Sequence, residues 1–386
     1  MPIVMLSSLR SFEAWMFACA LLLSLLPFSM AAQVEPTPAD SAAMQRAPGE
    51  WQADYEVDES PRPNVWPDRL ASDSAYAHYG PINRFLAPAR SYDPQRFWTS
   101  IGVSSAISGG LSAWLWKAWY AKNEIGPFKT IDDRGEWEGM DKLGHIYSTY
   151  QYARLSYRAA RWTGTHRKRS LLIATGVGLG LQTTVEIMDG HSQAWGFSVA
   201  DMAANAAGAG LFASQQLLWD DQRIRLKFGY TPQRYPHTPI PSSQGDGSRF
   251  TLRQRADALY GTTLAQRLVK DYNAQTIWLS ANPAVLFGRS RGRMPWLNLA
   301  VGYSANDVYG AHGNNWGRNG YALRASEITQ RGREYALSLD IDLERLPIKN
   351  PVLRTVLTAL NLFKVPAPAL LYQQASGRLQ WSWLYM

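Results

Sequence analysis

Acidic side chains, one histidine and one amide recur at helical spacing between residues 141 and 205, in segments that are otherwise apolar or rich in small residues. Asp141 and His145 are four residues apart, as are Asp201 and Asn205, so each pair shares one face of a helix. Such a pattern of acids and bases predicts a polar site between packed helices, suited to acid–base chemistry or to a divalent metal ion.

Glu186 and Asp189 are the least easily explained members of this group. They lie three residues apart at the end of an apolar segment that is predicted to be helical. Carboxylates at a helix C-terminus oppose the helix dipole, so both need compensation from another part of the chain. Asp141, by contrast, fits a helix start, where a carboxylate meets free N–H groups.

Two interpretations of the site stay open. In the structural one, Lys142 pairs with an acid, His145 hydrogen-bonds a carboxylate, and Asn205 satisfies the backbone of loop 195–197, because buried polar groups are normally paired. In the functional one, the same cluster is a catalytic or metal site, although the Glu-x-x-His pattern of di-iron bundles is absent. The candidate catalytic residues are His145, Glu186 and Asp201; the candidate metal ligands are His145, Glu186, Asp189 and Asp201; the structural polar network is Asp141, Lys142 and Asn205.

The elements that would hold this site are helices predicted at about 98–120, 141–162, 170–189 and 198–220. Two of them are apolar enough to cross a bilayer. A transmembrane arrangement would nevertheless place an acidic linker inside and a basic loop outside, against the positive-inside rule. We therefore expect a bundle of about four helices beyond the inner membrane.

The C-terminal part alternates apolar and polar residues at 297–303, 335–343 and 379–385, which predicts half-buried antiparallel strands. Residues 352–363 interrupt them with apolar positions at helical spacing. About five or six strands are fewer than the roughly eight of a membrane barrel, which favours a soluble sheet or a membrane-seated one.

The N-terminus predicts export. Arg10 precedes an apolar run at 14–28, and small residues follow at 29–32, the order of a secretory signal. Cys19 lies inside that run, so the processed chain would contain no cysteine for disulfides or thiol catalysis. The net charge of +8 then favours an anionic membrane surface over nucleic acid, and 16 Trp and 19 Tyr are consistent with such an interface.

The predicted fold class is α+β, with an N-terminal helical bundle followed by a C-terminal antiparallel β-rich region. The expected organisation is a signal peptide at 1–32, an irregular lead-in at 33–95, the helical bundle at 96–230, a Pro/Ser/Gly linker at 231–260 and the β-rich, envelope-associated region at 261–386.

The motif elements together resemble a known family. Asp-Lys-x-x-His, Glu-x-x-Asp and Ser-x-x-Trp-Gly-Phe-Ser-x-x-Asp-x-x-x-Asn-x-x-Gly resemble the YfiM-like periplasmic lipoproteins (domain of unknown function 2279), over about residues 130–230. The similarity to VanZ-type membrane proteins is weaker. The resemblance implies an envelope location and no known activity, and the chain lacks the lipobox cysteine of the shorter members. The matching positions are Asp141, Lys142, His145, Glu186, Asp189, Ser192, Trp195, Gly196, Phe197, Ser198, Asp201, Asn205 and Gly208.

These observations predict an exported protein of the outer membrane or periplasm that is non-enzymatic and binds membrane lipid or another envelope protein. The alternative is a metal-assisted or acid–base enzyme acting on envelope lipid or an anionic head group. A divalent metal is the candidate cofactor, no nucleic acid is expected as a partner, and the oligomeric state is left open.

Overall fold

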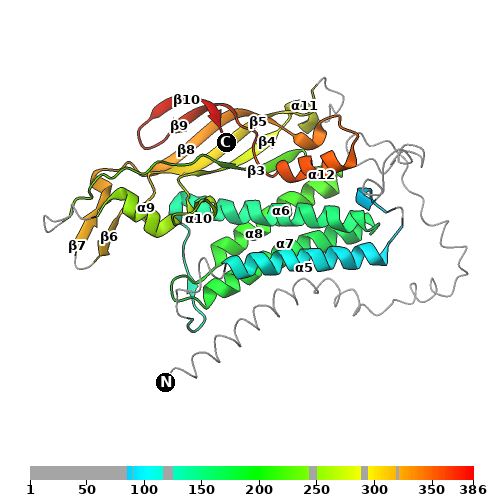
Figure 1. Cartoon of the computed structure of the whole chain (residues 1–386), viewed down its shortest axis with the longest axis horizontal. Helices are drawn as coiled ribbons and strands as arrows, with labels where there is room; N and C mark the ends of the chain where they lie inside the picture. Colours follow the sequence, from blue (N-terminus) through cyan, green and yellow to red (C-terminus); the bar gives the residue numbers. More distant parts are fainter. Residues whose placement is uncertain (1–84, 90, 116–124, 243–249, 288–293, 319–320) are drawn as a thin grey trace, which may run out of the picture.

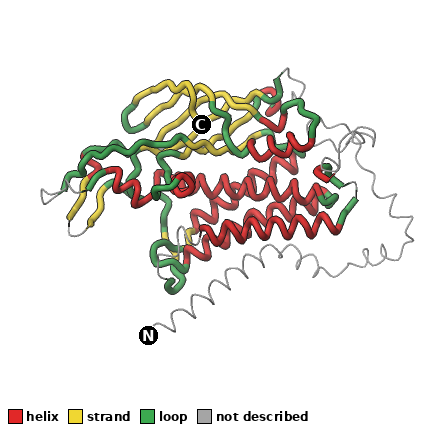
Figure 2. Tube along the Cα trace, in the orientation of Figure 1, coloured by secondary structure: helices red, strands yellow, loops and turns green. Residues whose placement is uncertain are grey.

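The computed structural model describes residues 85–89, 91–115, 125–242, 250–287, 294–318 and 321–386. The predicted signal at 1–32 and most of the predicted lead-in lie outside these residues. The described chain forms two layers, with long helices on one side and a curved antiparallel sheet on the other (Figures 1 and 2). The α+β class is confirmed.

Four helices make up the helical layer: α5 (Pro94–Leu115), α6 (Met140–Trp162), α7 (Arg167–Gly190) and α8 (Val199–Trp219). Helix α6 lies between α7 and α8 and the first strands of the sheet (Figure 1). By length and composition one helix in the described part of the chain, Arg167–His191, could cross a membrane. The core helix of a soluble protein can have the same length and composition, but such a helix is mostly buried. In Arg167–His191, 28% of the most apolar 18-residue stretch is buried.

The prediction of about four helices is wrong for the chain as a whole, because the described residues contain eight. The other four are shorter and lie between the strands: α9 (Leu252–Tyr260), α10 (Leu264–Lys270), α11 (Pro283–Leu286) and α12 (Pro351–Leu360). Helix α9 falls within the predicted linker. Both α9 and α10 begin with a capping box, at Thr251 and Thr263, a local signal that the loop-rich composition of this region obscured.

Small residues allow the long helices to approach closely. A Cβ atom on Gly208 of α8 would lie 2.3 Å from the carbonyl oxygen of Ile146 on α6, and one on Gly178 of α7 would lie 3.0 Å from that of Thr149. Helix α8 begins at Ser198, whose hydroxyl accepts the backbone N–H of Asp201 at 3.0 Å. The packing of α6, α7 and α8 thus brings the polar residues of all three helices together.

Six strands form the main sheet, in the order β10-β9-β8-β5-β4-β3, and every neighbouring pair is antiparallel. Strand β3 begins at residue 224, before the change of composition that marks the start of the predicted linker. The strands are β3 (Ile224–Tyr230), β4 (Gln275–Ala281), β5 (Leu297–Asn306), β8 (Gly332–Ile341), β9 (Ala367–Gln373) and β10 (Arg378–Tyr385). Two short strands, β1 (Thr130–Ile131) and β2 (Phe197–Ser198), pair in parallel beside the helices, and β6 (Asn315–Arg318) and β7 (Tyr321–Arg324) form a separate hairpin.

The main sheet curls on itself. Tyr385 on β10 contacts the ring of Trp278 on β4 edge to face, with centroids 5.9 Å apart, although three strands separate β10 from β4 in the sheet. Its hydroxyl also lies 3.1 Å from the hydroxyl of Thr276 on β4 and donates to Glu334 on β8 at 3.0 Å. One face of the sheet is therefore enclosed by its own curvature.

A group of four buried charges, called here the charged knot, joins the two layers. Arg154 and Arg158 of α6 and Arg225 of β3 all pair with Glu344, which follows β8 in the chain. Burial alone would raise the pKa of Glu344, but the three guanidinium groups hold it well below its ordinary value. Glu344, on the C-terminal part of the chain, thus provides a shared counter-charge for two arginines of α6 and one of β3.

Candidate functional site

The polar cluster is organised around the ammonium group of Lys142. Its Nζ lies 2.5 Å from Asp133 Oδ2, 3.0 Å from Asp141 Oδ2 and 2.9 Å from Asp201 Oδ1. These carboxylates come from the loop before α6, from the first turn of α6 and from the first turn of α8. Burial would lower the pKa of Lys142, yet the surrounding carboxylates raise it, so the ammonium stays charged.

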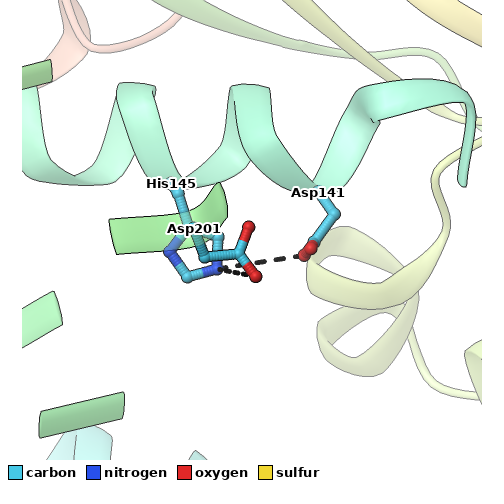
Figure 3. A group of neighbouring side chains, drawn as sticks. All are labelled: Asp141, His145 and Asp201. Atoms are coloured by element: carbon cyan, nitrogen blue, oxygen red, sulfur yellow. Dashed lines mark ion pairs between the residues drawn. The ribbon is translucent and has the colours of Figure 1, made fainter. Parts of the chain in front are cut away.

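His145, one turn after Asp141 on α6, faces the same carboxylates from the other side. Its Nε2 lies 3.9 Å from Asp141 Oδ1, 3.9 Å from Asp201 Oδ2 and 3.5 Å from Glu186 Oε1. Burial would lower the pKa of His145, but the three negative charges raise it above its ordinary value. Figure 3 shows the carboxylates of Asp141 and Asp201 directed at the same nitrogen of the ring.

Asn205 of α8 holds the opposite nitrogen of the imidazole. Its Oδ1 lies 3.0 Å from His145 Nδ1 and also accepts the hydroxyl of Thr149 at 3.1 Å. The expectation that Asn205 satisfies the backbone of loop 195–197 is therefore wrong for the contacts that the structure describes. Glu186 binds the backbone just beyond that loop instead, because its Oε2 accepts the N–H of Ser198 at 3.1 Å.

Glu186 is almost completely buried, with 1% of its surface exposed, and its second oxygen, Oε1, has no hydrogen-bond partner. Burial raises the pKa of Glu186 to about 8, although the nearby imidazole lowers it. Burial, together with the charge of Asp141, likewise raises the pKa of Asp201 to about 7. Both carboxyl groups thus titrate near neutral pH, a property typical of functional sites but also of dense structural ion clusters.

The atoms best placed to hold a metal ion belong to Asp141, His145 and Asp201, which offer three ligand atoms within 4.8 Å of one another. Of the predicted ligands, the structure brings His145, Glu186 and Asp201 together. Asp189 is half-buried and lies outside the three-residue group. Asp141, predicted as part of the structural network, takes part in both the ion pair with Lys142 and the group around His145 Nε2.

Two residues of the cluster were missed by sequence reasoning. Asp133 lies in the acidic linker, and its Oδ1 accepts the hydroxyl of Ser198 at 2.6 Å. Tyr272, in the turn before β4, donates to Asp141 Oδ1 at 3.3 Å. The segment Lys-Asp-Tyr-Asn at 270–273 has the polar composition of a turn, and spacing alone could not identify the tyrosine as a contact of the helical layer.

A second candidate site is the convex surface of the sheet, called here the apolar sheet face. One row of directly paired residues crosses β4, β5, β8, β9 and β10. Each of these side chains is between 41% and 55% exposed. The row consists of Leu279, Val301, Leu337, Leu370 and Trp381, and its neighbours on the same face include Leu299, Leu339, Tyr335, Tyr372 and Leu379.

The opposite, enclosed face of the same strands combines a buried apolar cluster, which includes Trp278, Leu371 and Tyr385, with polar and charged groups. Lys227 of β3 and Asp340 of β8 are fully buried there as an ion pair, with Nζ and Oδ2 2.7 Å apart. Ser280 donates to the same carboxylate at 2.6 Å. The alternation predicted for these strands is present. Near α6 the apolar face packs into the core through Leu226, Ile277 and Tyr303, but farther across the sheet the same face is exposed, unlike the apolar side of a soluble sheet.

Helix α12 also exposes its apolar side. Its apolar side chains Val352, Leu353, Val356 and Leu360 are each at least 40% exposed. Its polar side faces the helical layer, where Thr358 accepts a hydrogen bond from Arg158 at 2.9 Å. An amphipathic helix normally turns its apolar stripe toward the protein core, so α12 presents an unpartnered apolar surface.

Comparison with known proteins supports the location of this chain. No curated protein and no solved structure matched it. The weaker similarity to VanZ-type proteins is not shown. A family model described as predicted periplasmic lipoprotein (DUF2279) matches residues 131–216, the span that holds Asp133, α6, α7 and most of α8. This description supports export to the periplasm and assigns no activity. Residues 131–216, which form most of the helical layer, are thus similar to the DUF2279 family of predicted periplasmic lipoproteins.

Proposed function

We propose that this protein is a membrane-surface protein of the cell envelope, which binds the lipid bilayer through the apolar sheet face and helix α12. The exposed apolar row across five strands is the observation that carries this proposal. Soluble monomers rarely expose contiguous apolar patches beyond a few hundred Å², and larger ones mark membrane or protein contacts.

Several features favour lipid over a protein partner. The row from Leu279 to Trp381 carries no charge, and the charged residue on this face of β8, Arg333, lies at the start of the strand, whereas Lys227 and Asp340 are enclosed on the other face. Trp381 and Trp383 of β10 are 55% and 75% exposed, and tryptophan and tyrosine are the residues favoured at bilayer interfaces. The chain's net charge of +8 suits an anionic lipid surface. Anchoring at the outer membrane would place this face on its periplasmic leaflet.

Vesicle co-sedimentation tests the proposal. The purified full chain is mixed with vesicles of phosphatidylethanolamine and phosphatidylglycerol, and the bound fraction is measured for wild type and for Val301→Glu/Leu337→Glu. Half-burying each side chain in lipid contributes about 1 kcal/mol, and inserting a carboxylate costs more. The double variant should therefore bind at least about tenfold more weakly.

Leu172→Glu on α7 is the matched control, because Leu172 is 75% exposed but lies on the helical layer. It should bind vesicles as wild type does. Equal binding by the wild type and the double variant would overturn the proposal. So would sedimentation-velocity data showing a wild-type dimer that the double variant loses, together with no vesicle binding, because the face would then be an interface between two copies of the chain.

A further inference from the structure

In two carboxylates around His145, one oxygen contacts Lys142 and the other faces the imidazole. In Asp141, Oδ2 is held by Lys142, while Oδ1 faces His145 Nε2. In Asp201, Oδ1 is held by Lys142, while Oδ2 faces the same nitrogen. One ammonium group thus fixes the orientation of two carboxylates from two helices and leaves one oxygen of each directed at the imidazole.

Glu186 follows the same arrangement with a different anchor. The backbone N–H of Ser198 holds its Oε2, and its Oε1, buried and without a hydrogen-bond partner, lies 3.5 Å from His145 Nε2. A buried carboxylate oxygen without a partner is costly and calls for an explanation, such as an ion that the contacts within the chain do not provide.

The imidazole itself is oriented as a ligand. The amide oxygen of Asn205 already accepts from Thr149, so it also accepts from the Nδ1–H of His145, which places the lone pair of the neutral ring on Nε2. The amide nitrogen of Gln182 is 3.4 Å from Nδ1, a longer contact than the 3.0 Å to Asn205. The lone pair therefore points into the space bounded by Asp141 Oδ1, Asp201 Oδ2 and Glu186 Oε1.

The distances fit an ion better than a direct ion pair. A protonated imidazole bonded to a carboxylate would lie about 2.7–2.9 Å from its oxygen. The observed separations are 3.5 Å and 3.9 Å. Two ligand atoms that each lie about 2.1 Å from one tetrahedral ion are about 3.4 Å apart, close to these values.

The charge balance agrees. Asp133, Asp141, Glu186 and Asp201 supply four carboxylates against one ammonium, that of Lys142. Metal ligands bind in their deprotonated form, so in the bound state the four carboxylates are ionised, the imidazole is neutral, and three negative charges remain after Lys142 is counted. A divalent cation compensates two of these charges.

We propose that His145 Nε2, Asp141 Oδ1 and Asp201 Oδ2 bind one divalent transition-metal ion, with Glu186 Oε1 as the fourth donor. Tyr272 borders the site by its contact with Asp141, and Asn205 acts as a positioning residue. One imidazole with carboxylate oxygens and no thiolate suits Zn²⁺ or Mn²⁺, whereas Ca²⁺ and Mg²⁺ prefer oxygen ligands throughout.

Isothermal titration calorimetry with Zn²⁺ and with Mn²⁺ on the chelator-treated full chain tests this site. Wild type should bind one ion per chain, and His145→Ala and Glu186→Gln should each weaken binding at least tenfold. Asp189→Asn is the matched control, since Asp189 lies three residues from Glu186 on the same helix but outside the ligand group; it should bind within twofold of wild type.

The positioning role of Asn205 has its own readout. Asn205→Ala should weaken binding about 10- to 100-fold, and Asn205→Asp, which retains an acceptor for Nδ1, should restore most of the affinity. The visible absorption of bound Co²⁺ reports the ligand geometry, and it should change in Asn205→Ala and return in Asn205→Asp. Circular dichroism confirms that each variant is folded. Absence of saturable binding by wild type, or wild-type affinity in folded His145→Ala, overturns the proposal.

Discussion

Asp340→Asn tests whether the inner face of the curled sheet excludes water, because the carboxylate of Asp340 is the counter-charge of Lys227 on that face. The carboxylate lies 2.7 Å from Lys227 Nζ, accepts from Ser280 at 2.6 Å and accepts the N–H of Val365 at 3.1 Å. Asparagine has the same shape and keeps an acceptor for Ser280 and Val365. The substitution therefore removes the charge with little change in packing.

The expected loss of stability follows from the lysine that is left. Breaking a buried ion pair by removing one partner costs about 3–5 kcal/mol. The loss has an upper limit, because Lys227 can release its proton instead: at pH 7, deprotonating a lysine with an ordinary pKa of 10.5 costs about 5 kcal/mol. Burial already lowers the pKa of Lys227, and removing Asp340 lowers it further. We expect a decrease of about 3–5 kcal/mol in the free energy of unfolding.

Urea unfolding followed by far-UV circular dichroism measures this decrease. Lys227→Met/Asp340→Asn should recover most of the stability lost by the single variant, giving a coupling energy of at least about 2 kcal/mol. The exposed pair of Asp132 and Arg134 provides the control, and Asp132→Asn should leave the midpoint of urea unfolding unchanged. If Asp340→Asn stays within about 0.5 kcal/mol of wild type, or if the two single effects simply add, the enclosed face is not dry and the assignment of faces is wrong.

Three further predictions concern packing, charge and pH. Gly208→Ala should destabilise the chain by about 2–3 kcal/mol in thermal unfolding, because its Cβ would lie 2.3 Å from a carbonyl oxygen of α6, whereas Gly210→Ala, with nothing within 4 Å, should stabilise it by about 0.5–1 kcal/mol; equal effects would contradict the close approach. Glu344→Gln should cost about 3–5 kcal/mol in urea unfolding, since it removes the one carboxylate that all three arginines of the charged knot share and leaves Asp342 as the remaining partner of Arg225, and a loss below about 1 kcal/mol would refute that role. Burial lowers the pKa of Lys364 to about 8, so the unfolded state binds more protons between pH 8 and 10.5. The stability of wild type relative to Lys364→Met should therefore rise with pH in that window, by at most about 1.4 kcal/mol per unit, and a flat or falling difference would contradict it.

The strands illustrate how far sequence patterns reach. Alternation at 297–303, 335–343 and 379–385 predicted three strands correctly, because the side-chain period of a strand is two whatever surrounds it. The same pattern cannot tell which face is buried. Which face is buried depends on the curvature of the sheet, which brings Tyr385 into contact with Trp278. This curvature arises from contacts between distant strands, so no short stretch of sequence indicates it.

Helical spacing was more informative for the candidate site. The expectation that acids at the end of α7 need outside compensation applies to Glu186, which meets the N–H of Ser198 at the start of α8. Asp133 could not be found in this way, since it lies outside any helix and reaches Ser198 across 65 residues of chain. Asp189 was grouped with Glu186 by spacing, but positions three apart point in directions about 60° from each other around the helix, enough to leave it outside the ligand group.

The charged knot has a consequence for how this protein is made. Arg154 forms an ion pair with Glu344, which lies 190 residues later in the chain. Arg154 and Arg158 lie on α6 and Arg225 on β3, so all three precede both of their carboxylate partners, Asp342 and Glu344, in the chain. In a chain made from its N-terminus, the arginines are therefore present before these two counter-charges, and the charged knot closes only when the C-terminal part has arrived.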